Sequence, residues 1–139
     1  MNRLYTWTNR LALVVEDDPL NYLYIELLLK KKTGIDVMWA KNGSQTIELF
    51  AKHKSIDIIL LDLQLPDIDG FQVLKKIKEI NPQIPILIQT AHTWNDEDRR
   101  SKSAGADGFF SKPLHADSLL RKMDAELNKY ISYLSEITS

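Results

Sequence analysis

The sequence predicts an α/β protein with a doubly wound, five-stranded parallel sheet and helices on both faces. Three observations predict this fold. Short apolar runs of strand-forming residues alternate with longer helical stretches, polar side chains follow these runs, and 139 residues suit one domain that buries a sizeable core. Strands that alternate with helices pair in parallel, with right-handed crossovers between them. We therefore expect successive strand–helix units in a (βα)5 architecture.

Three strand–helix units are predicted in the first half of the chain. The run LALVV is a strand, and Asp18 is a helix cap with Pro19 in the first turn of a helix that extends to about Lys31. The strand IDVMWA precedes a helix from Ser44. The strand IDIILLD precedes a helix from about Phe71.

Two further units follow. The strand IPILIQT precedes a helix from about Asn95, and the strand DGFFS precedes a final helix from Asp117. Gly34 and Gly105 stand just before the second and fifth strands, where the left-handed residue that ends a helix is expected.

Composition excludes several classes of function. The 18 Lys and Arg residues nearly balance 19 Asp and Glu residues, so the net charge of −1 provides no basic field for nucleic acid or an anionic membrane. The absence of cysteine excludes disulfides and thiolate zinc sites. The apolar runs are too short to span a bilayer. We expect a cytoplasmic protein with no nucleic-acid or membrane partner, a tail or linker over residues 1–10, and one domain over residues 11–139.

Polar residues gather at the predicted carboxyl ends of the strands, which share one edge of a parallel sheet. These residues are Glu16, Asp17 and Asp18 after the first strand, Asp62 after the third, Thr90 after the fourth and Lys112 after the fifth. Ligands of doubly wound sheets bind at this edge. Asp18 is explained as a helix cap, which leaves Glu16 and Asp17 to face Asp62.

Three neighbouring carboxylates cannot all be ionised unless a cation compensates them, because like charges in one site raise a pKa. Oxygen ligands without His or Cys favour a hard ion, and Mg²⁺ is the natural choice because it keeps waters and accepts a phosphate oxygen. Lys112 supplies a point charge and Thr90 a hydroxyl donor, both suited to a tetrahedral anion. Asp62 is then the nucleophile, and an acyl phosphate is its product.

Four segments resemble, in order, the motifs of the receiver domains of two-component response regulators. They are VVEDDPLN, LLDLQLPDIDGF, ILIQTA and AGADGFFSKP. The resemblance covers the chain from about Leu11 to the last helix and implies a flavodoxin-like strand order, 2-1-3-4-5. It implies a signalling domain that takes a phosphoryl group from the phosphohistidine of a histidine kinase or histidine phosphotransfer domain, and that catalyses only its own phosphorylation and dephosphorylation. ILIQTA is most similar to receivers of hybrid histidine kinases, and the sequence leaves open whether the chain is a stand-alone regulator or part of such a kinase.

The resemblance also implies how the acidic residues act. Asp62 is the phosphoacceptor, Asp17 a direct Mg²⁺ ligand and Glu16 a ligand through water. The backbone carbonyl of Gln64 is the remaining protein oxygen on the metal.

The remaining roles concern the phosphoryl group. The resemblance implies that Thr90 and Lys112 hold its oxygens, and that Thr90 and Phe109 switch a surface made of the fourth helix, fifth strand and fifth helix. It also implies that Gln64 and His92 flank the attacking water and tune the lifetime of the acyl phosphate.

Two other functions stay open from the sequence. An aspartate-nucleophile phosphatase of the haloacid dehalogenase type uses the same intermediate, but such enzymes place a second aspartate two residues after the nucleophile, where this chain has Gln64. A degenerate receiver used only as a binding module would lack some site residues, whereas the set here is complete.

Two local expectations complete the interpretation. By resemblance, Lys112 and Pro113 are joined by a cis peptide bond. The final helix carries apolar residues at alternating spacings of three and four, namely Leu120, Met123, Leu127, Tyr130, Leu134 and Ile137. We expect its second half, from Tyr130, to project beyond the sheet and to allow weak homodimerisation through this extended C-terminal helix.

Overall fold

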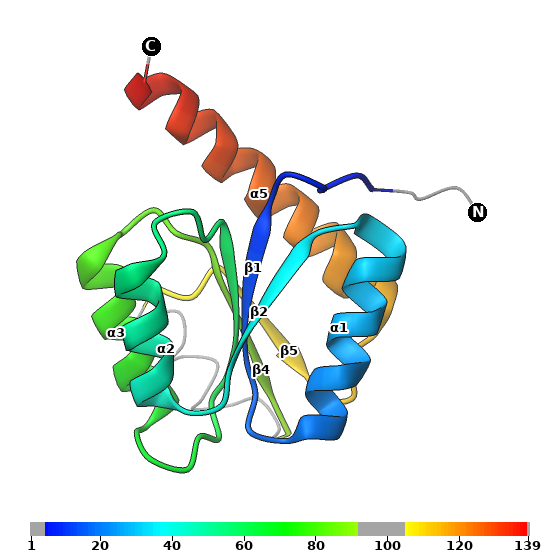
Figure 1. Cartoon of the computed structure of the whole chain (residues 1–139), viewed down its shortest axis with the longest axis vertical. Coiled ribbons are helices and arrows are strands. Elements are labelled where there is room, and N and C mark those ends of the chain that lie inside the picture. The colour runs from blue at the N-terminus through cyan, green and yellow to red at the C-terminus, as the bar shows by residue number, and fades with distance from the viewer. Residues whose placement is uncertain (1–4, 92–104, 139) are drawn as a thin grey trace.

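The strands form one parallel sheet in the order β2-β1-β3-β4-β5, as predicted (Figure 1). The computed structural model describes residues 5–91 and 105–138. Its strands are β1 (Leu11–Val15), β2 (Asp36–Ala40), β3 (Ile58–Asp62), β4 (Ile86–Thr90) and β5 (Gly108–Ser111). Because all of them run in the same direction, their carboxyl ends meet at one edge.

Helices cover both faces of this sheet. They are α1 (Pro19–Thr33), α2 (Gly43–Lys52), α3 (Gly70–Ile80) and α5 (Ala116–Thr138). Figure 1 shows α1 and α5 on one face and α2 and α3 on the other. The helix predicted from about Asn95 lies outside the described residues. Within the described parts of the chain, no helix is long and apolar enough to cross a membrane. The cytoplasmic location stays a prediction.

The ends of α1 follow the local signals in the sequence. The Asp18 side chain accepts a hydrogen bond of 3.0 Å from the Leu20 N–H, and Pro19 begins the helix. Gly34 has a φ of 74°, and its N–H donates to the Lys30 carbonyl over 3.1 Å. Both predictions for α1 are confirmed. Gly105 also has a positive φ, of 99°.

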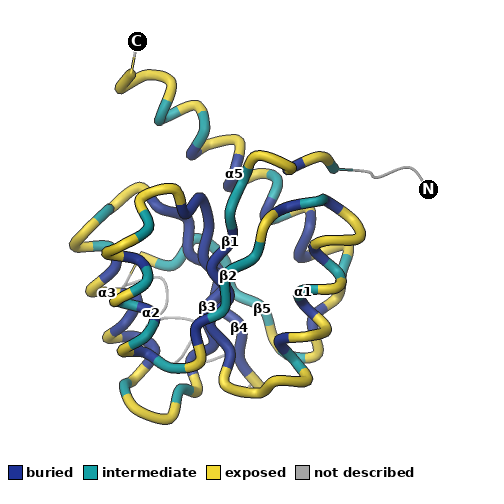
Figure 2. The backbone as a smooth tube through the Cα atoms, viewed as in Figure 1, coloured by how far each residue is buried: buried dark blue, intermediate teal, exposed yellow. Residues whose placement is uncertain are grey.

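Successive side chains along each strand point to opposite faces of the sheet, so the core is divided into two layers. The layer under α2 and α3 takes the strand residues Leu13, Val15, Ile59, Leu61, Ile86 and Ile88. The layer under α1 and α5 takes Ala12, Val14, Ile58, Leu60 and Leu87. Figure 2 shows these strands as buried backbone between helices whose outer faces are exposed. Burial on both faces explains why the strands are nearly continuous apolar runs.

The C-terminal half of α5 departs from the prediction at Tyr130. Figure 1 shows α5 extending past the sheet, yet Tyr130 is buried and accepts a 3.0 Å hydrogen bond from the Asn81 side chain. The expectation that Tyr130 projects without cover is therefore wrong, because the segment after α3 packs against this turn of α5. Leu134 is half-buried against the first core layer, and Ile137 is exposed.

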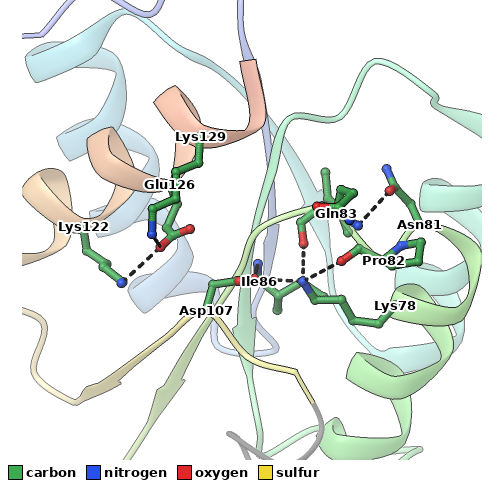
Figure 3. A network of polar contacts seen from close by, with 10 residues as sticks. Lys78, Asn81, Pro82, Gln83, Ile86, Asp107, Lys122, Glu126 and Lys129 are labelled. Atoms are coloured by element: carbon green, nitrogen blue, oxygen red, sulfur yellow. Dashed lines mark hydrogen bonds and ion pairs between the residues drawn. The ribbon is translucent and has the colours of Figure 1, made fainter. Parts of the chain in front are cut away.

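The amino-end edge of the sheet is held by a polar network (Figure 3). The Lys78 ammonium on α3 lies 2.9 Å from the Asp107 carboxylate and 2.7 Å from the Ile84 carbonyl oxygen. Glu126 on α5 is buried and pairs with Lys122 at 3.1 Å and Lys129 at 3.3 Å. A pocket of about 410 Å³ lies here, between α5 and the segments before β4 and β5. It is at the edge opposite the predicted site.

Candidate functional site

The sheet register brings the predicted carboxylates together. Val15 pairs with Leu61, so Glu16 and Asp62 follow as neighbours at the carboxyl ends of β1 and β3. A carboxylate oxygen from each of Glu16, Asp17 and Asp62 lies within 4.8 Å of the others. Glu16 and Asp62 are buried, at 0% and 1% exposure, and Asp17 is exposed. The cluster therefore opens to solvent on the side of Asp17.

Lys112 reaches this cluster from the far side of β4. Its ammonium nitrogen lies 2.7 Å from Asp62 Oδ2 and 3.1 Å from Glu16 Oε1. Because β4 lies between β3 and β5, the Lys112 side chain passes over the carboxyl end of β4. The peptide bond between Lys112 and Pro113 is cis, as expected.

Burial and hydrogen bonding act in opposite directions on the pKa values of these three groups. Desolvation raises the pKa of Asp62 to about 6, although the Lys112 ammonium and the Gln64 N–H act against it. Desolvation also raises the pKa of Glu16, but hydrogen bonds from Asn21, the Asp18 N–H and Lys112 outweigh it and leave that pKa below its usual value. Burial lowers the pKa of Lys112, but its two carboxylate partners outweigh this effect and raise it overall.

Several residues that hold Glu16 were missed from the sequence. The Asn21 side chain donates to Glu16 Oε1, and the Asp18 N–H donates to Oε2 over 3.1 Å. The Trp39 indole donates to the Glu16 carbonyl oxygen over 2.7 Å, and its ring stacks on Tyr22 with centroids 4.2 Å apart. Asn21 belongs to the segment VVEDDPLN, which was the available signal. Nothing in the local sequence indicated Trp39.

The loop after β3 is fixed at both ends. The Gln64 N–H donates to Asp62 Oδ1 over 2.9 Å. The Asp67 carboxylate accepts hydrogen bonds of 2.8 Å and 3.0 Å from the N–H groups of Gly43 and Ser44 at the start of α2. These backbone donors lower the pKa of Asp67 to about 2. The loop that follows the candidate nucleophile is thereby tied to a neighbouring helix.

The other predicted residues lie as follows. Thr90 is buried at the end of β4, and its carbonyl accepts a 2.8 Å hydrogen bond from the Lys112 N–H. Phe109 on β5 is half-buried and packs against the core layer under α2 and α3. His92 lies outside the described residues.

The donor set fits a hard divalent cation. Three carboxylates and one ammonium give a formal charge of −3 + 1 = −2 at this edge. All the ligating atoms are oxygens, and one carboxylate is open to solvent, which suits an ion that keeps water molecules. The chain therefore presents an acidic cluster of the kind that binds a metal ion.

Comparison with known proteins identifies one family over most of the chain. The model of the response regulator receiver domain matches residues 12–124. The chain is 34% identical over 128 residues to hybrid signal transduction histidine kinase I of Dictyostelium discoideum, covering 86% of this chain and 7% of that protein. It is 32% identical over 118 residues to the cell cycle transcriptional regulator CtrA of Caulobacter vibrioides, covering 85% of this chain and 50% of that protein. The chain thus spans half or less of the length of these two relatives.

Solved structures agree with the fold. A two-component response regulator from Clostridium difficile superimposes with a TM-score of 0.80 at 28% identity, covering 86% of this chain and 96% of that one. A CheY-like receiver domain protein from Methanospirillum hungatei gives a TM-score of 0.81 at 23% identity, covering 89% and 98%. With an acidic cluster, Asp62 and Lys112 at the carboxyl edge of a 2-1-3-4-5 sheet, this chain belongs to the receiver domain family of two-component response regulators.

Proposed function

We propose that this domain accepts a phosphoryl group on Asp62 from a phosphohistidine and thereby switches a protein-interaction surface. The observation that carries the proposal is the placement of a buried carboxylate at a strand end, 2.7 Å from an ammonium and beside two further carboxylates. A buried carboxylate lowers the stability of the fold unless an opposite charge compensates it, so its presence indicates a functional role.

The transfer itself requires little covalent help from the protein. An Asp62 carboxylate oxygen attacks phosphorus, the phosphorus–nitrogen bond of the donor breaks, and the imidazole leaves with the electron pair. Lys112 and the Thr90 hydroxyl hold the phosphoryl oxygens. Glu16, Asp17, Asp62 and the Gln64 carbonyl are the residues that would hold Mg²⁺, which when bound neutralises charge on those oxygens. Gln64 and His92 would then tune hydrolysis of the acyl phosphate.

The energy available is sufficient for a switch. A phosphoryl group carries about two negative charges, and each hydrogen bond donated to such a charged group contributes about 1.5–3 kcal/mol. Inverting a 1:99 equilibrium takes about 5.5 kcal/mol. Two such bonds near the upper end of that range, or three near its middle, reach this value, and Thr90 and Lys112 are among the donors. We propose that Thr90 and Phe109 transmit the change to the surface that includes β5 and α5.

An exposed apolar face beside the site supports a protein as the phosphodonor. The α1 side chains on this face are spaced by three and four residues and are 46% to 78% exposed; they are Leu20, Leu23, Tyr24 and Leu27. Helix α1 begins two residues after Asp17, so this face adjoins the acidic cluster. A histidine kinase or histidine phosphotransfer domain that docks here would bring its phosphohistidine to Asp62.

The division of the chain is also a proposal. We assign residues 11–139 to the receiver domain and residues 1–10 to an N-terminal segment. Trp7 in that segment is buried in the core layer under α1 and α5, and its backbone N–H donates to the Thr33 carbonyl over 2.8 Å. The segment is therefore attached to the domain at Trp7.

Weak self-association through α5 is the remaining proposal about partners. Ile137 is 59% exposed, while Tyr133 and Leu134 are half-buried. A stable interface buries about 800 Å² on each partner, far more than one exposed side chain provides. Sedimentation of the chain and of Ile137→Ser tests this: a monomer at high concentration for both, with and without beryllium fluoride, would exclude the contact.

The phosphoacceptor proposal is tested by labelling with acetyl phosphate and Mg²⁺, followed by mass spectrometry of the intact chain and its peptides. We expect one phosphoryl group on Asp62 and none in Asp62→Asn. Equal labelling of that variant would contradict the assignment. Steady turnover of a phosphate ester would favour a phosphatase, and no labelling of the wild-type chain would favour a binding module.

A further inference from the structure

Gln89 is a buried amide that the receiver fold alone does not explain. It lies on β4 with 2% of its surface exposed, and neither its Nε2 nor its Oε1 has a hydrogen-bond partner among residues 5–91 and 105–138. Buried side-chain amides are nearly always satisfied, and an apolar residue would fit this layer without that cost. In the unphosphorylated domain the Nε2 and Oε1 atoms of Gln89 therefore remain available for a partner.

The strand register places this amide next to Asp62 of the candidate site. Asp62 pairs with Gln89, and Gln89 pairs with Phe110. Two residues earlier on the same strands, Leu60 and Leu87 both face the core layer under α1 and α5. Side chains two residues apart share a face of a sheet, so Asp62 and Gln89 stand side by side on that face.

Lys112 passes over this position. Its side chain starts just after β5 and ends on Asp62 and Glu16, across the carboxyl end of β4. The ammonium group has three N–H donors, and those two carboxylates account for two of them. Gln89 is thus the buried amide on the strand that the Lys112 side chain crosses.

Phosphorylation of Asp62 changes what Lys112 can bind. Formation of the oxygen–phosphorus bond turns one carboxylate oxygen into the bridging oxygen of an acyl phosphate, which removes the carboxylate charge and brings about two negative charges on the phosphoryl group. Lys112 must then hold the phosphoryl group from above β4, in buried surroundings where each N–H needs an acceptor. A neutral amide oxygen can accept such a bond without adding further negative charge beside the phosphoryl group, Glu16 and Asp17.

We propose that Gln89 is a positioning residue whose Oε1 accepts a hydrogen bond from the Lys112 ammonium when Asp62 is phosphorylated. This inference rests on the proposed phosphoacceptor function. It explains why a buried amide without partners stands one residue before Thr90: its partner belongs to the phosphorylated state.

The test compares Gln89→Met with Leu87→Met. Methionine keeps the length of Gln89 and removes both polar atoms, and Leu87→Met repacks the same face of the same strand without touching an amide. With acetyl phosphate as donor, we expect Gln89→Met to lower the maximal phosphorylation rate about tenfold at unchanged half-saturation, because a hydrogen bond to a charged group is lost. The rate of Leu87→Met should stay within about twofold of the wild-type rate.

A spectroscopic readout separates positioning from a general effect on packing. On addition of beryllium fluoride and Mg²⁺ to the wild-type chain, the Gln89 side-chain NH₂ resonances should shift. The Lys112 ammonium should give a protected ¹⁵N–¹H signal that disappears in Gln89→Met and persists in Leu87→Met. Two results would overturn the inference in a wild-type chain that is labelled on Asp62. One is Gln89 resonances that do not shift, and the other is a Lys112 signal and a phosphorylation rate that are unchanged in Gln89→Met. A wild-type chain that is not labelled would overturn the phosphoacceptor function as well.

Discussion

Replacing Lys112 with methionine removes the cation between two buried carboxylates and keeps most of the aliphatic side chain. In the folded protein the Asp62 and Glu16 side chains are 2% and 0% exposed, and the Lys112 side chain is 23% exposed. Removing one partner of such a buried pair costs about 3–5 kcal/mol, because the remaining charges are left without compensation. With a urea m-value of about 2 kcal/mol/M, the unfolding midpoint should fall by about 1.5–2.5 M.

The pH dependence of this loss of stability follows from the protonation of the carboxylates. Without Lys112 the pKa of Asp62 rises further above about 6, so the folded state binds more protons than the unfolded state as the pH falls. The loss should therefore be largest near pH 8 and shrink toward pH 5. Mg²⁺ should restore part of it, because a bound cation replaces the missing charge.

Urea unfolding of Lys112→Met at pH 8 and pH 5, in EDTA and in Mg²⁺, measures these quantities. Lys129→Met is the matched control: the Lys129 ammonium lies 3.3 Å from Glu126 but its side chain is 74% exposed, so the change should stay within about 1 kcal/mol. If Lys112→Met unfolds within about 1 kcal/mol of the wild-type chain at pH 8 in EDTA, the buried ion pair does not stabilise the fold as argued.

Three further predictions concern single groups. Without metal, Asp62 should titrate near pH 6 in ¹³C-carboxylate NMR, so its contribution to stability falls as the pH rises from about 4 to about 6; a pKa at or below its usual 3.8 would contradict the desolvation argument. Gly70→Ala should destabilise the fold by about 1–3 kcal/mol in urea unfolding, because the added Cβ would lie 2.7 Å from Leu63 Cα; unchanged stability would mean that the loop relaxes freely. Tyr130→Phe should cost about 0.5–1.5 kcal/mol by loss of the Asn81 hydrogen bond, and a neutral result would place that hydroxyl in solvent.

The chain order of the elements and the residues that meet in the candidate site could be predicted because they depend on local signals. Apolar runs with strand propensity end in Glu16, Asp62, Thr90 and Lys112, and parallel pairing brings strand ends to one edge whatever the details of packing. Asp18 and Gly34 marked the ends of α1 because capping needs specific side chains and backbone angles.

Other features depended on contacts between segments distant in sequence. Tyr130 is buried because Asn81 and its neighbours meet α5, 49 residues along the chain, and no periodicity within α5 carries that information. The Trp39 hydrogen bond to Glu16 arises in the same way, 23 residues apart.

The sequence by itself determined the fold class, the carboxyl edge and the chemical types that gather there, since these follow from periodicity, capping and parallel pairing. Only the tertiary structure decided that desolvation raises the pKa of Asp62 to about 6, and that Gln89 stands beside Asp62 where Lys112 crosses β4. Both depend on burial and strand register, which the packing of the whole domain sets and which no short segment encodes.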